Sequence, residues 1–280
     1  MSCVGTVDGA ITCLAKALQK AGIDDAMREA RLITAMGLGI DRARLALALQ
    51  DPIGNADLQM LLETAGPRLE GRPLSHVLGQ RAFYNHDFRV TPDVLDPRPD
   101  TETLVNAALA RPFRRVLDLG TGSGAILLSL LDGRPDACGL GTDISEAALG
   151  IARVNAARLR VQDRSDFLLS DWFAQVEGGF DLIVSNPPYI ALDEMDALAP
   201  ELAFEPRMAL TDEGDGLSAY RVIVPGAGGH LRPGGWLMVE IGWRQGPAAG
   251  RMFADAGFAD IDVLPDLDGR DRVVQGRWPG

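Results

Sequence analysis

The 280-residue sequence predicts an α/β fold in which a mainly parallel sheet carries helices on both faces and follows a small helical bundle. Apolar residues recur at helical spacing through the N-terminal quarter of the chain. From Arg114 onward, strand-like and helix-like segments alternate, which is the pattern of βαβ units. A loop with three alternating glycines joins the first of these strands to the next helix, as in α/β folds that bind nucleotides.

Residues 1–75 are expected to form a helical domain. Between Ile11 and Leu18, apolar side chains follow the i, i+3, i+4, i+7 spacing of one buried helix face. A second helix runs to Gly37, and two more helical segments follow over 41–49 and 56–69.

Residues 76–99 are expected to form a linker that begins with a β-hairpin. Aromatic and β-branched residues flank a turn-like cluster at 85–87, which predicts two short paired strands. Pro92, Pro97 and Pro99 then exclude a long helix, because proline fixes φ and removes a backbone donor. The domain boundary is therefore expected here.

Residues 100–280 are expected to form the α/β domain. The last two strands are joined by residues 265–271 alone, a connection too short for a helical crossover, so they should pair antiparallel. The sheet should then be mainly parallel, with one antiparallel strand near the C-terminus. The expected strands are 116–119, 139–142, 166–169, 180–184, 236–241, 261–264 and 272–275, and the expected helices include 125–131, 146–159 and 217–231.

The charge balance excludes several classes of protein. Acidic residues outnumber basic ones by 39 to 27, which gives a net charge of −12, and only Lys16 and Lys20 are lysines. Neither lysine follows a glycine-rich loop, so the chain has no Walker A motif for phosphate binding. A Schiff-base mechanism is also disfavoured, because one of these two lysines would have to supply the amine. Residues 91–280 carry the whole net charge, which disfavours binding to nucleic acid.

The remaining composition indicates a cytoplasmic protein without a metal site. Cys3, Cys13 and Cys138 are far apart and form no CxxC motif, as expected of free buried thiols in a reducing compartment. The three histidines lack metal-ligand spacing. No signal-peptide pattern and no run of about 18 apolar residues is evident, so no membrane association is expected.

The glycine-rich loop is the first candidate site. It lies between a predicted strand and a predicted helix, where glycine permits a tight turn and lets a ligand approach the backbone. The helix N-terminus adds free N–H donors and a partial positive charge. A nucleotide-like ligand is expected on its five residues, which are Gly120, Thr121, Gly122, Ser123 and Gly124.

Acidic and aromatic residues follow the next two strands. Asp143 ends the second strand, at a distance from the glycines that suits a carboxylate binding both ribose hydroxyls of an adenosine. The alternative is an N-cap for the next helix, a role that Ser145 would fill equally well. Asp171 and Trp172 follow the third strand, where an acceptor and a flat ring could hold adenine.

The sharpest motif follows the fourth strand and consists of Asn186, Pro187, Pro188 and Tyr189. The prolines stiffen the backbone and supply no N–H donor, so the loop presents acceptors: the Asn186 side-chain oxygen and the Pro187 carbonyl. Tyr189 adds a flat apolar face. Two acceptors and a stacking face suit a planar NH₂ group, which has two hydrogens to place.

These motifs together resemble class I S-adenosylmethionine-dependent methyltransferases that act on planar nitrogens. The segments 72–79, 94–102, 186–190, 205–210, 215–217 and 269–273 narrow the resemblance to the peptide chain release factor glutamine methyltransferases, the HemK/PrmC family. The resemblance covers about residues 70–278 and implies a Rossmann-like class I methyltransferase sheet behind a helical N-terminal domain. Two residues depart from the pattern: Asp96 stands at a usually apolar position, and Asp100 replaces a glutamate.

The resemblance also implies a role for each motif. The glycine-rich loop would hold the methionine end of S-adenosyl-L-methionine, Asp143 its ribose, and Asp171 and Trp172 its adenine. The product would be S-adenosyl-L-homocysteine. Residues 186–189 would hold the substrate glutamine, with Asn186, Pro187 and Tyr189 at the reaction centre and Asn186 also beside the cofactor. Release factors would be the protein partners. Separately from the resemblance, residues 1–75 are expected to recognise the protein substrate, because they form a domain of their own that contains none of these motifs.

Other functions stay open at this point. A methyltransferase acting on a ribosomal protein's glutamine would use the same motifs. A DNA or RNA base methyltransferase could too, but a basic stripe or a recognition insert would be expected. A nicotinamide-dependent dehydrogenase would share the glycine loop and leave the Asn-Pro-Pro-Tyr loop unexplained. A non-catalytic protein would bind the cofactor without turnover. The sequence does not assign a role to residues 205–217.

Overall fold

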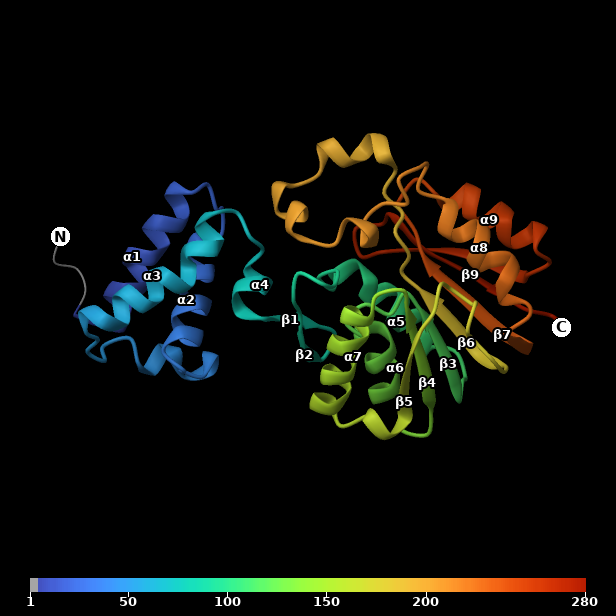
Figure 1. The fold of residues 1–280 in the computed structure, drawn as a ribbon, viewed down its shortest axis with the longest axis horizontal. Coiled ribbons are helices and arrows are strands. Elements are labelled where there is room, and N and C mark those ends of the chain that lie inside the picture. The colour runs from blue at the N-terminus through green and yellow to red at the C-terminus, as the bar shows by residue number, and fades with distance from the viewer. Residues whose placement is uncertain (1–4) are drawn as a thin grey trace. The chain divides into compact units, whose positions relative to one another are not determined.

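The computed structural model of the protein describes residues 5–280, so Cys3 and the first four residues of the predicted helical domain lie outside it (Figure 1). The chain forms two compact units. One consists of Met1–Gln80 together with the distant segment Ala199–Phe204, and the other of Arg81–Leu198 and Glu205–Gly280. The chain therefore passes from the α/β unit into the helical unit and back again within a few residues.

The helical unit is built on three α-helices that bury one common apolar core, followed by the short helix α4. The predicted segment at 41–49 forms a 3₁₀-helix, Arg42–Leu47, instead of an α-helix. Arg68 is buried and bonds two carboxylates, Glu29 at 2.6 Å and Glu201 at 2.8 Å. The second of these pairs ties the segment Ala199–Phe204 to the helices. The helix bounds are α1 Val7–Lys20, α2 Ala26–Gly37, α3 Asn55–Leu69 and α4 Leu74–Leu78.

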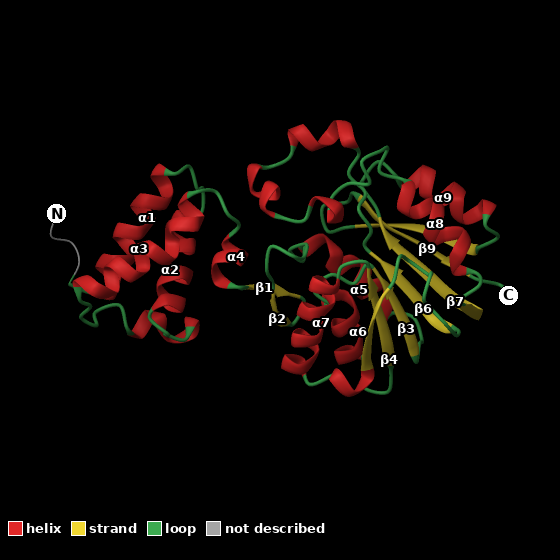
Figure 2. Cartoon of the chain, viewed as in Figure 1, coloured by secondary structure: helices red, strands yellow, loops and turns green. Residues whose placement is uncertain are grey.

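The predicted α/β fold is confirmed. Seven strands form one sheet in the order β5-β4-β3-β6-β7-β9-β8, in which β9 runs antiparallel to both of its neighbours and every other pairing is parallel. Figure 2 shows the strands of this sheet in yellow with helices packed around them in red. The expected hairpin precedes the sheet as β1 Gln80–Phe83 and β2 His86–Arg89. The strand bounds are β3 Arg115–Leu119, β4 Cys138–Asp143, β5 Ser165–Leu169, β6 Phe180–Ser185, β7 Leu231–Glu240, β8 Ala259–Pro265 and β9 Asp271–Arg277.

Two apolar cores cover the two faces of the sheet. Helices α5, α6 and α7 contribute to one core, and α8 and α9 contribute to the other. Strands such as β3 and β6 are buried almost throughout, as expected of parallel strands between two helical layers. The helix bounds are α5 Glu102–Leu109, α6 Ala125–Gly133, α7 Glu146–Leu159, α8 Ser218–Ala227 and α9 Gly246–Asp255.

Several elements differ from the sequence prediction. Helix α5 was not expected, yet Pro99 stands in the first turn of the 3₁₀-helix that leads into it, where proline is well tolerated. The predicted helix over 217–231 is too long, because α8 ends at Ala227 before a pair of glycines and β7 already begins at Leu231. Cys138 is exposed rather than buried. Of residues 5–280, no helix is both long and apolar enough to cross a membrane.

Candidate active site

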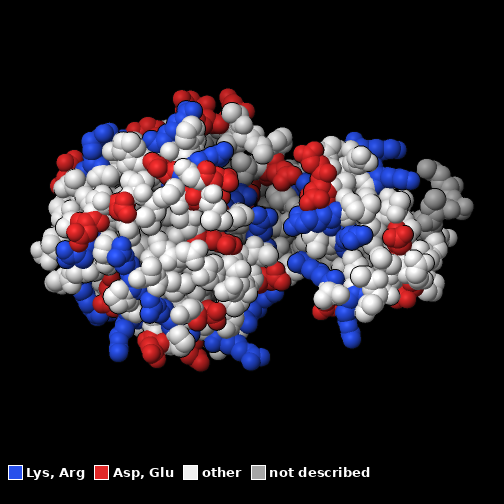
Figure 3. All heavy atoms as spheres, turned by 180° about the vertical axis from the view of Figure 1, so that it is seen from behind, with Lys and Arg blue, Asp and Glu red and all other residues white. Residues whose placement is uncertain are grey.

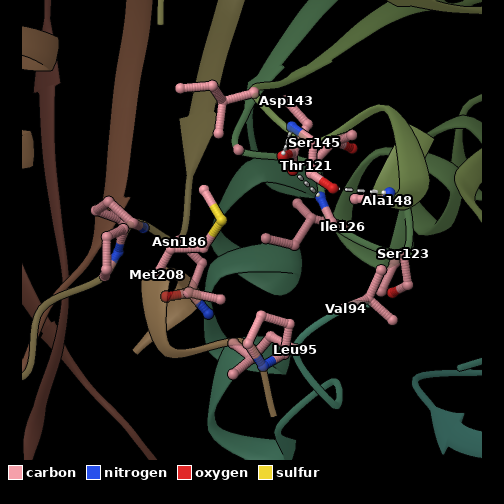
Figure 4. A pocket seen from close by; sticks show the side chains of 18 of the residues that line it. Val94, Leu95, Thr121, Ser123, Ile126, Asp143, Ser145, Ala148, Asn186 and Met208 are labelled. Atoms are coloured by element: carbon pink, nitrogen blue, oxygen red, sulfur yellow. Dashed lines mark hydrogen bonds between the residues drawn. The ribbon is translucent and has the colours of Figure 1, made fainter. Parts of the chain in front are cut away.

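A cavity of about 290 Å³ lies where four neighbouring strands of the sheet end (Figure 4). The loops that follow β3, β4, β5 and β6 all contribute to its lining, and these strands are adjacent in the order β5-β4-β3-β6. Parallel strands bring their carboxyl ends to one edge, which is where ligands bind in open α/β sheets. Residues far apart in the sequence therefore meet at one site. Of the predicted site residues, Gly120, Thr121, Gly122, Ser123, Asp143, Asp171, Trp172, Asn186, Pro187 and Pro188 line this cavity.

The glycine-rich loop turns sharply between β3 and α6. Gly120, Gly122 and Gly124 have φ of 68°, 55° and 80°, values that L side chains rarely adopt. The Thr121 hydroxyl donates to Asp118 Oδ2 at 2.7 Å beneath the loop, and burial raises the pKa of Asp118 to about 7. Gly124 does not line the cavity. A Cβ there would meet Leu128 at 3.0 Å, so this glycine serves the close packing at the start of α6.

Asp143 fastens the glycine-rich loop to the end of β4. Its Oδ2 accepts from the Gly122 N–H and its Oδ1 from the Ser145 N–H, both at 2.9 Å, and Figure 4 shows Asp143 among the cavity side chains. Burial raises the pKa of Asp143, while these two N–H groups act in the opposite direction. Ser145, not Asp143, caps α7, because its hydroxyl accepts from the Ala148 N–H at 3.2 Å. The carboxylate retains lone pairs that can accept from a ligand.

Asp171 and Trp172 form the part of the lining contributed by the loop after β5. Trp172 has a left-handed backbone, with φ of 46°, and the Ser170 hydroxyl donates to its carbonyl at 2.9 Å. The Trp172 ring lies against Gly120, where a Cβ would be 3.8 Å from the ring. Asp171 is exposed. The strained turn thus places a flat ring beside the glycine-rich loop.

The loop after β6 presents an amide to the cavity. Asn186 Nδ2 donates to the Thr101 hydroxyl at 3.1 Å, and among residues 5–280 no group donates to Asn186 Oδ1. Tyr189 lies outside the cavity lining. Its hydroxyl donates to Glu240 Oε1 at 3.4 Å, and its carbonyl accepts from Gln245 Nε2 at 2.9 Å. Stacking of Tyr189 on a substrate therefore stays a prediction.

Two further parts of the lining come from segments that the sequence analysis did not assign to the site. The linker contributes Val94, Leu95, Pro97 and Arg98, and the segment around Met208 adds Pro206 and Ala209. Figure 4 shows Met208 and Asn186 close together, with Leu95 and Val94 along another side. Both segments contain residues that carry the family resemblance, and this was the signal that could have assigned them to the site.

One buried carboxylate holds these two segments together. Glu205 accepts from Arg98 at 2.5 Å and from the Asp96 N–H at 3.1 Å, and its side chain is 1% exposed. The two unusual aspartates are also paired: Asp96 with Arg81 at 3.6 Å and Asp100 with Arg272 at 3.0 Å. The local packing has therefore adapted to both departures.

The cavity suits a ligand with a diol near one end and a reacting centre near Asn186. The N-terminus of α6 favours negative charge, and Asp143 offers acceptors near it. Apolar groups such as Ile126, Val94 and Met208 complete the walls. Within the described part of the chain, no three His, Cys, Asp or Glu side chains gather to hold a metal ion.

Comparisons with known proteins show which family and which fold this chain resembles. Residues 93–242 match the family model "Methyltransferase small domain", and residues 10–79 match "PrmC N-terminal domain". A release factor glutamine methyltransferase of Cereibacter sphaeroides is 53% identical over 94% of this chain and 95% of its own length. One from Bordetella pertussis is 45% identical over 89% and 93%. The crystal structure of a methyltransferase from Pyrococcus furiosus shares the fold, with a TM-score of 0.55, 17% identity, and coverage of 78% and 99%.

Proposed function

Because the chain belongs to the family of release factor glutamine methyltransferases, we propose that it methylates the glutamine of the Gly-Gly-Gln loop in peptide chain release factors. The observation that carries this proposal is the amide of Asn186. Its Nδ2 is held by Thr101, so its Oδ1 is left to accept from a substrate at the end of the cavity. Such an acceptor suits the NH₂ group of a glutamine side chain.

S-adenosylmethionine is the proposed methyl donor, and when bound it supplies a methyl group already activated by a sulfonium. The residues present fit it. Asp143 keeps free acceptor positions for the two ribose hydroxyls. The N–H groups of Thr121, Gly122 and Gly124 are already bonded, so Ser123 and the first turn of α6 would supply the donors to the carboxylate of the methionine end. Trp172 and Asp171 would hold the adenine ring by a flat contact and an acceptor.

The protein's own part in the reaction is to position a weak nucleophile. An amide nitrogen reacts poorly because its lone pair is delocalised into the carbonyl. The Asn186 Oδ1 and the Pro187 carbonyl would accept the two amide hydrogens and aim the nitrogen at the methyl carbon. As the nitrogen gains positive character, these hydrogen bonds strengthen, which is the stabilisation that accelerates the step. The spare proton can leave afterwards.

The proposal extends to the helical unit and to the site of action. Recognition of the protein substrate is assigned to the helices of Met1–Gln80, because the motifs around the cavity all belong to the other unit. A substrate of the translation machinery places the reaction in the cytoplasm. Nucleic acid is not a proposed partner. Residues 91–280 are strongly acidic, and basic and acidic side chains are interspersed on the face drawn in Figure 3.

The test is transfer of a labelled methyl group to purified release factor. We expect incorporation into wild-type release factor and none into a variant whose Gly-Gly-Gln glutamine is replaced by alanine. Ribosomal proteins and an adenine-containing oligonucleotide serve as parallel substrates. Preferential labelling of either one, with the release factor unlabelled, would replace the proposed substrate class. Cofactor binding without transfer to any of them would contradict an enzymatic role.

A further inference from the structure

We infer that Thr101 and Glu240 are positioning residues that fix the orientation of the Asn186 amide, so that its oxygen and not its nitrogen meets the substrate. The inference rests on the proposed function, since it concerns how the same acceptor is presented. Thr101 lies at the start of α5 and Glu240 at the end of β7. Neither residue belongs to the motif loop that contains Asn186.

The first link is the hydrogen bond from Asn186 Nδ2 to Thr101 Oγ1, at 3.1 Å. A hydroxyl has one hydrogen to donate and can also accept, so Thr101 alone could satisfy the Asn186 amide in either orientation. Thr101 is 3% exposed, and its hydroxyl does not cap α5. Its hydrogen is thus free to be directed elsewhere, and its direction decides which amide atom faces it.

Glu240 is the group that directs this hydrogen. It is fully buried, its Oε1 accepts from the Tyr189 hydroxyl at 3.4 Å, and its Oε2 has no hydrogen-bond partner among residues 5–280. The Thr101 hydroxyl favours the carboxylate form of Glu240, and its hydrogen would satisfy this buried acceptor. An ionised carboxylate can only accept, so it draws the Thr101 hydrogen to itself. The Thr101 oxygen must then accept from Asn186, which turns Nδ2 inward and leaves Oδ1 for the cavity. A protonated Glu240 would allow the opposite arrangement.

The charges around Glu240 control which state is present. The Arg272 guanidinium and the Tyr189 and Thr101 hydroxyls favour the carboxylate, whereas burial and Asp100 favour the acid. Burial is the largest of these influences and raises the pKa of Glu240 to about 7. The Tyr220 hydroxyl is directed elsewhere, donating to the Glu240 carbonyl at 2.9 Å. Because the carboxylate is the active form, turnover should fall as the pH decreases through this value.

A substrate amide needs this orientation. Its NH₂ group is a hydrogen-bond donor. If Asn186 also presented its NH₂ group, two donors would face each other and both would stay unpaired. Reversing the Asn186 amide would change little at the other residues proposed to contact the cofactor. The expected signature is therefore a loss of kcat with little change in the affinity for S-adenosylmethionine.

The experiment compares Thr101→Val, which keeps the shape but lacks the hydroxyl, with Thr101→Ser, which keeps the hydroxyl. We expect Thr101→Val and Glu240→Gln to lower kcat about 10- to 100-fold, the range typical of removing a residue that orients a functional group without contacting the substrate. Thr101→Ser should retain most of the activity. Wild-type kcat should rise between pH 6 and 8, and this slope should be absent in Thr101→Val and Glu240→Gln. Wild-type turnover and pH dependence in Thr101→Val would overturn the inference.

A readout without substrate separates this inference from the proposed function. The side-chain amide resonances of Asn186, assigned by their loss in Asn186→Ala, are followed by NMR from pH 6 to 8. They should titrate in the wild type and stay constant in Glu240→Gln. A constant wild-type signal contradicts the inference even if release factor is methylated. A titrating signal with no methyl transfer contradicts only the proposed function. Unchanged thermal unfolding in both variants excludes loss of fold.

Discussion

Asp143, the last residue of β4, accepts a 2.9 Å hydrogen bond from the N–H of Gly122, which lies in the loop after the adjacent strand β3. The residue proposed to hold the cofactor ribose therefore also shapes the loop proposed to hold the methionine end. The two halves of the cofactor cavity are coupled through one side chain.

Replacing Asp143 should weaken binding of S-adenosylmethionine. In Asp143→Asn, the amide cannot accept from both the Gly122 and Ser145 N–H groups, and the ribose loses a charged acceptor. We expect Kd to rise about 10- to 100-fold, which is the cost of losing one or two such bonds. Isothermal titration calorimetry measures this change. The exposed Asp166→Asn on β5 is the control, and equal affinities in the two variants would contradict the assignment.

Two glycines of the loop should have different roles, Gly124 in packing and Gly122 in the approach of the ligand. A Cβ on Gly124 would meet Leu128 at 3.0 Å and Ala152 at 3.2 Å, whereas a Cβ on Gly122 meets nothing within 4 Å. Both glycines have positive φ, which costs an alanine about 1–2 kcal/mol. Gly124→Ala should therefore lower Tm more than Gly122→Ala, and Gly122→Ala should lower cofactor affinity. Thermal unfolding and calorimetry on both variants check this; the reverse order would refute it.

Arg98 should be important for stability because it pairs with a buried carboxylate. In Arg98→Ala, Glu205 keeps its Asp96 N–H bond but loses its charged partner. Since Arg98 is itself partly exposed, we expect a loss of about 2–3 kcal/mol in the free energy of unfolding, somewhat below the cost of breaking a fully buried pair. Denaturant unfolding measures it. Arg221→Ala, from a surface pair with Asp215, should leave Tm unchanged.

A second substitution tests the reason for that loss. If the unpaired charge is responsible, Glu205→Gln added to Arg98→Ala should recover much of the stability, because a neutral amide is cheaper to bury than an unpaired carboxylate. Equal stability of the single and double variants would show that lost packing of Arg98 is the cause instead.

Asp118 should make stability depend on pH. Burial raises its pKa from 3.8 to about 7, so the folded state binds the proton more tightly than the unfolded chain. The resulting stabilisation is complete below about pH 4 and is lost as the pH rises through about 7. Relative to the wild type, Asp118→Asn should become more stable across this window, by at most about 4 kcal/mol. Unfolding at pH 4.5 and 8 tests the trend, with Asp163→Asn as the exposed control.

Removing the acceptor itself should separate catalysis from cofactor binding. Asn186→Ala removes Oδ1, the proposed acceptor for the substrate amide, and leaves the Asp143 carboxylate, the proposed ribose acceptor, unchanged. We expect turnover to fall at least about 100-fold while the cofactor Kd stays within a few-fold of the wild type. Single-turnover methyl transfer and calorimetry measure the two quantities. An active Asn186→Ala enzyme would rule out the proposed mechanism.

The sequence could predict those parts of the site that are encoded locally. The glycine-rich loop lies directly between a strand and a helix, and Asn186 with its two prolines directly follows a strand. The conformation of each loop is therefore determined by residues that are close in the sequence. The order of parallel strands then brings these loops together without further information.

The remaining wall could not be predicted because it depends on contacts between distant segments. Arg98 and Glu205 are 107 residues apart in the sequence, and their ion pair joins the linker to the segment that contains Met208. The bond between Asn186 and Thr101 spans 85 residues, and proline near Thr101 masked the helix that begins there. Tyr189 followed the motif in sequence, yet its side chain is drawn away from the lining by Glu240.

The passage of Ala199–Phe204 through the helical unit changes how that unit can be removed. Cutting the chain at residue 75 or 80 deletes Arg68 and Arg72, and so strips Glu201 of its ion-pair partner and Phe204 of its cation–π partner. A truncated enzyme would then carry an orphaned hexapeptide only a few residues from Met208 in the cavity wall. Reduced activity in such a truncation would not isolate substrate recognition. A clean dissection of the two units requires excising the hexapeptide as well, with a short glycine bridge in its place.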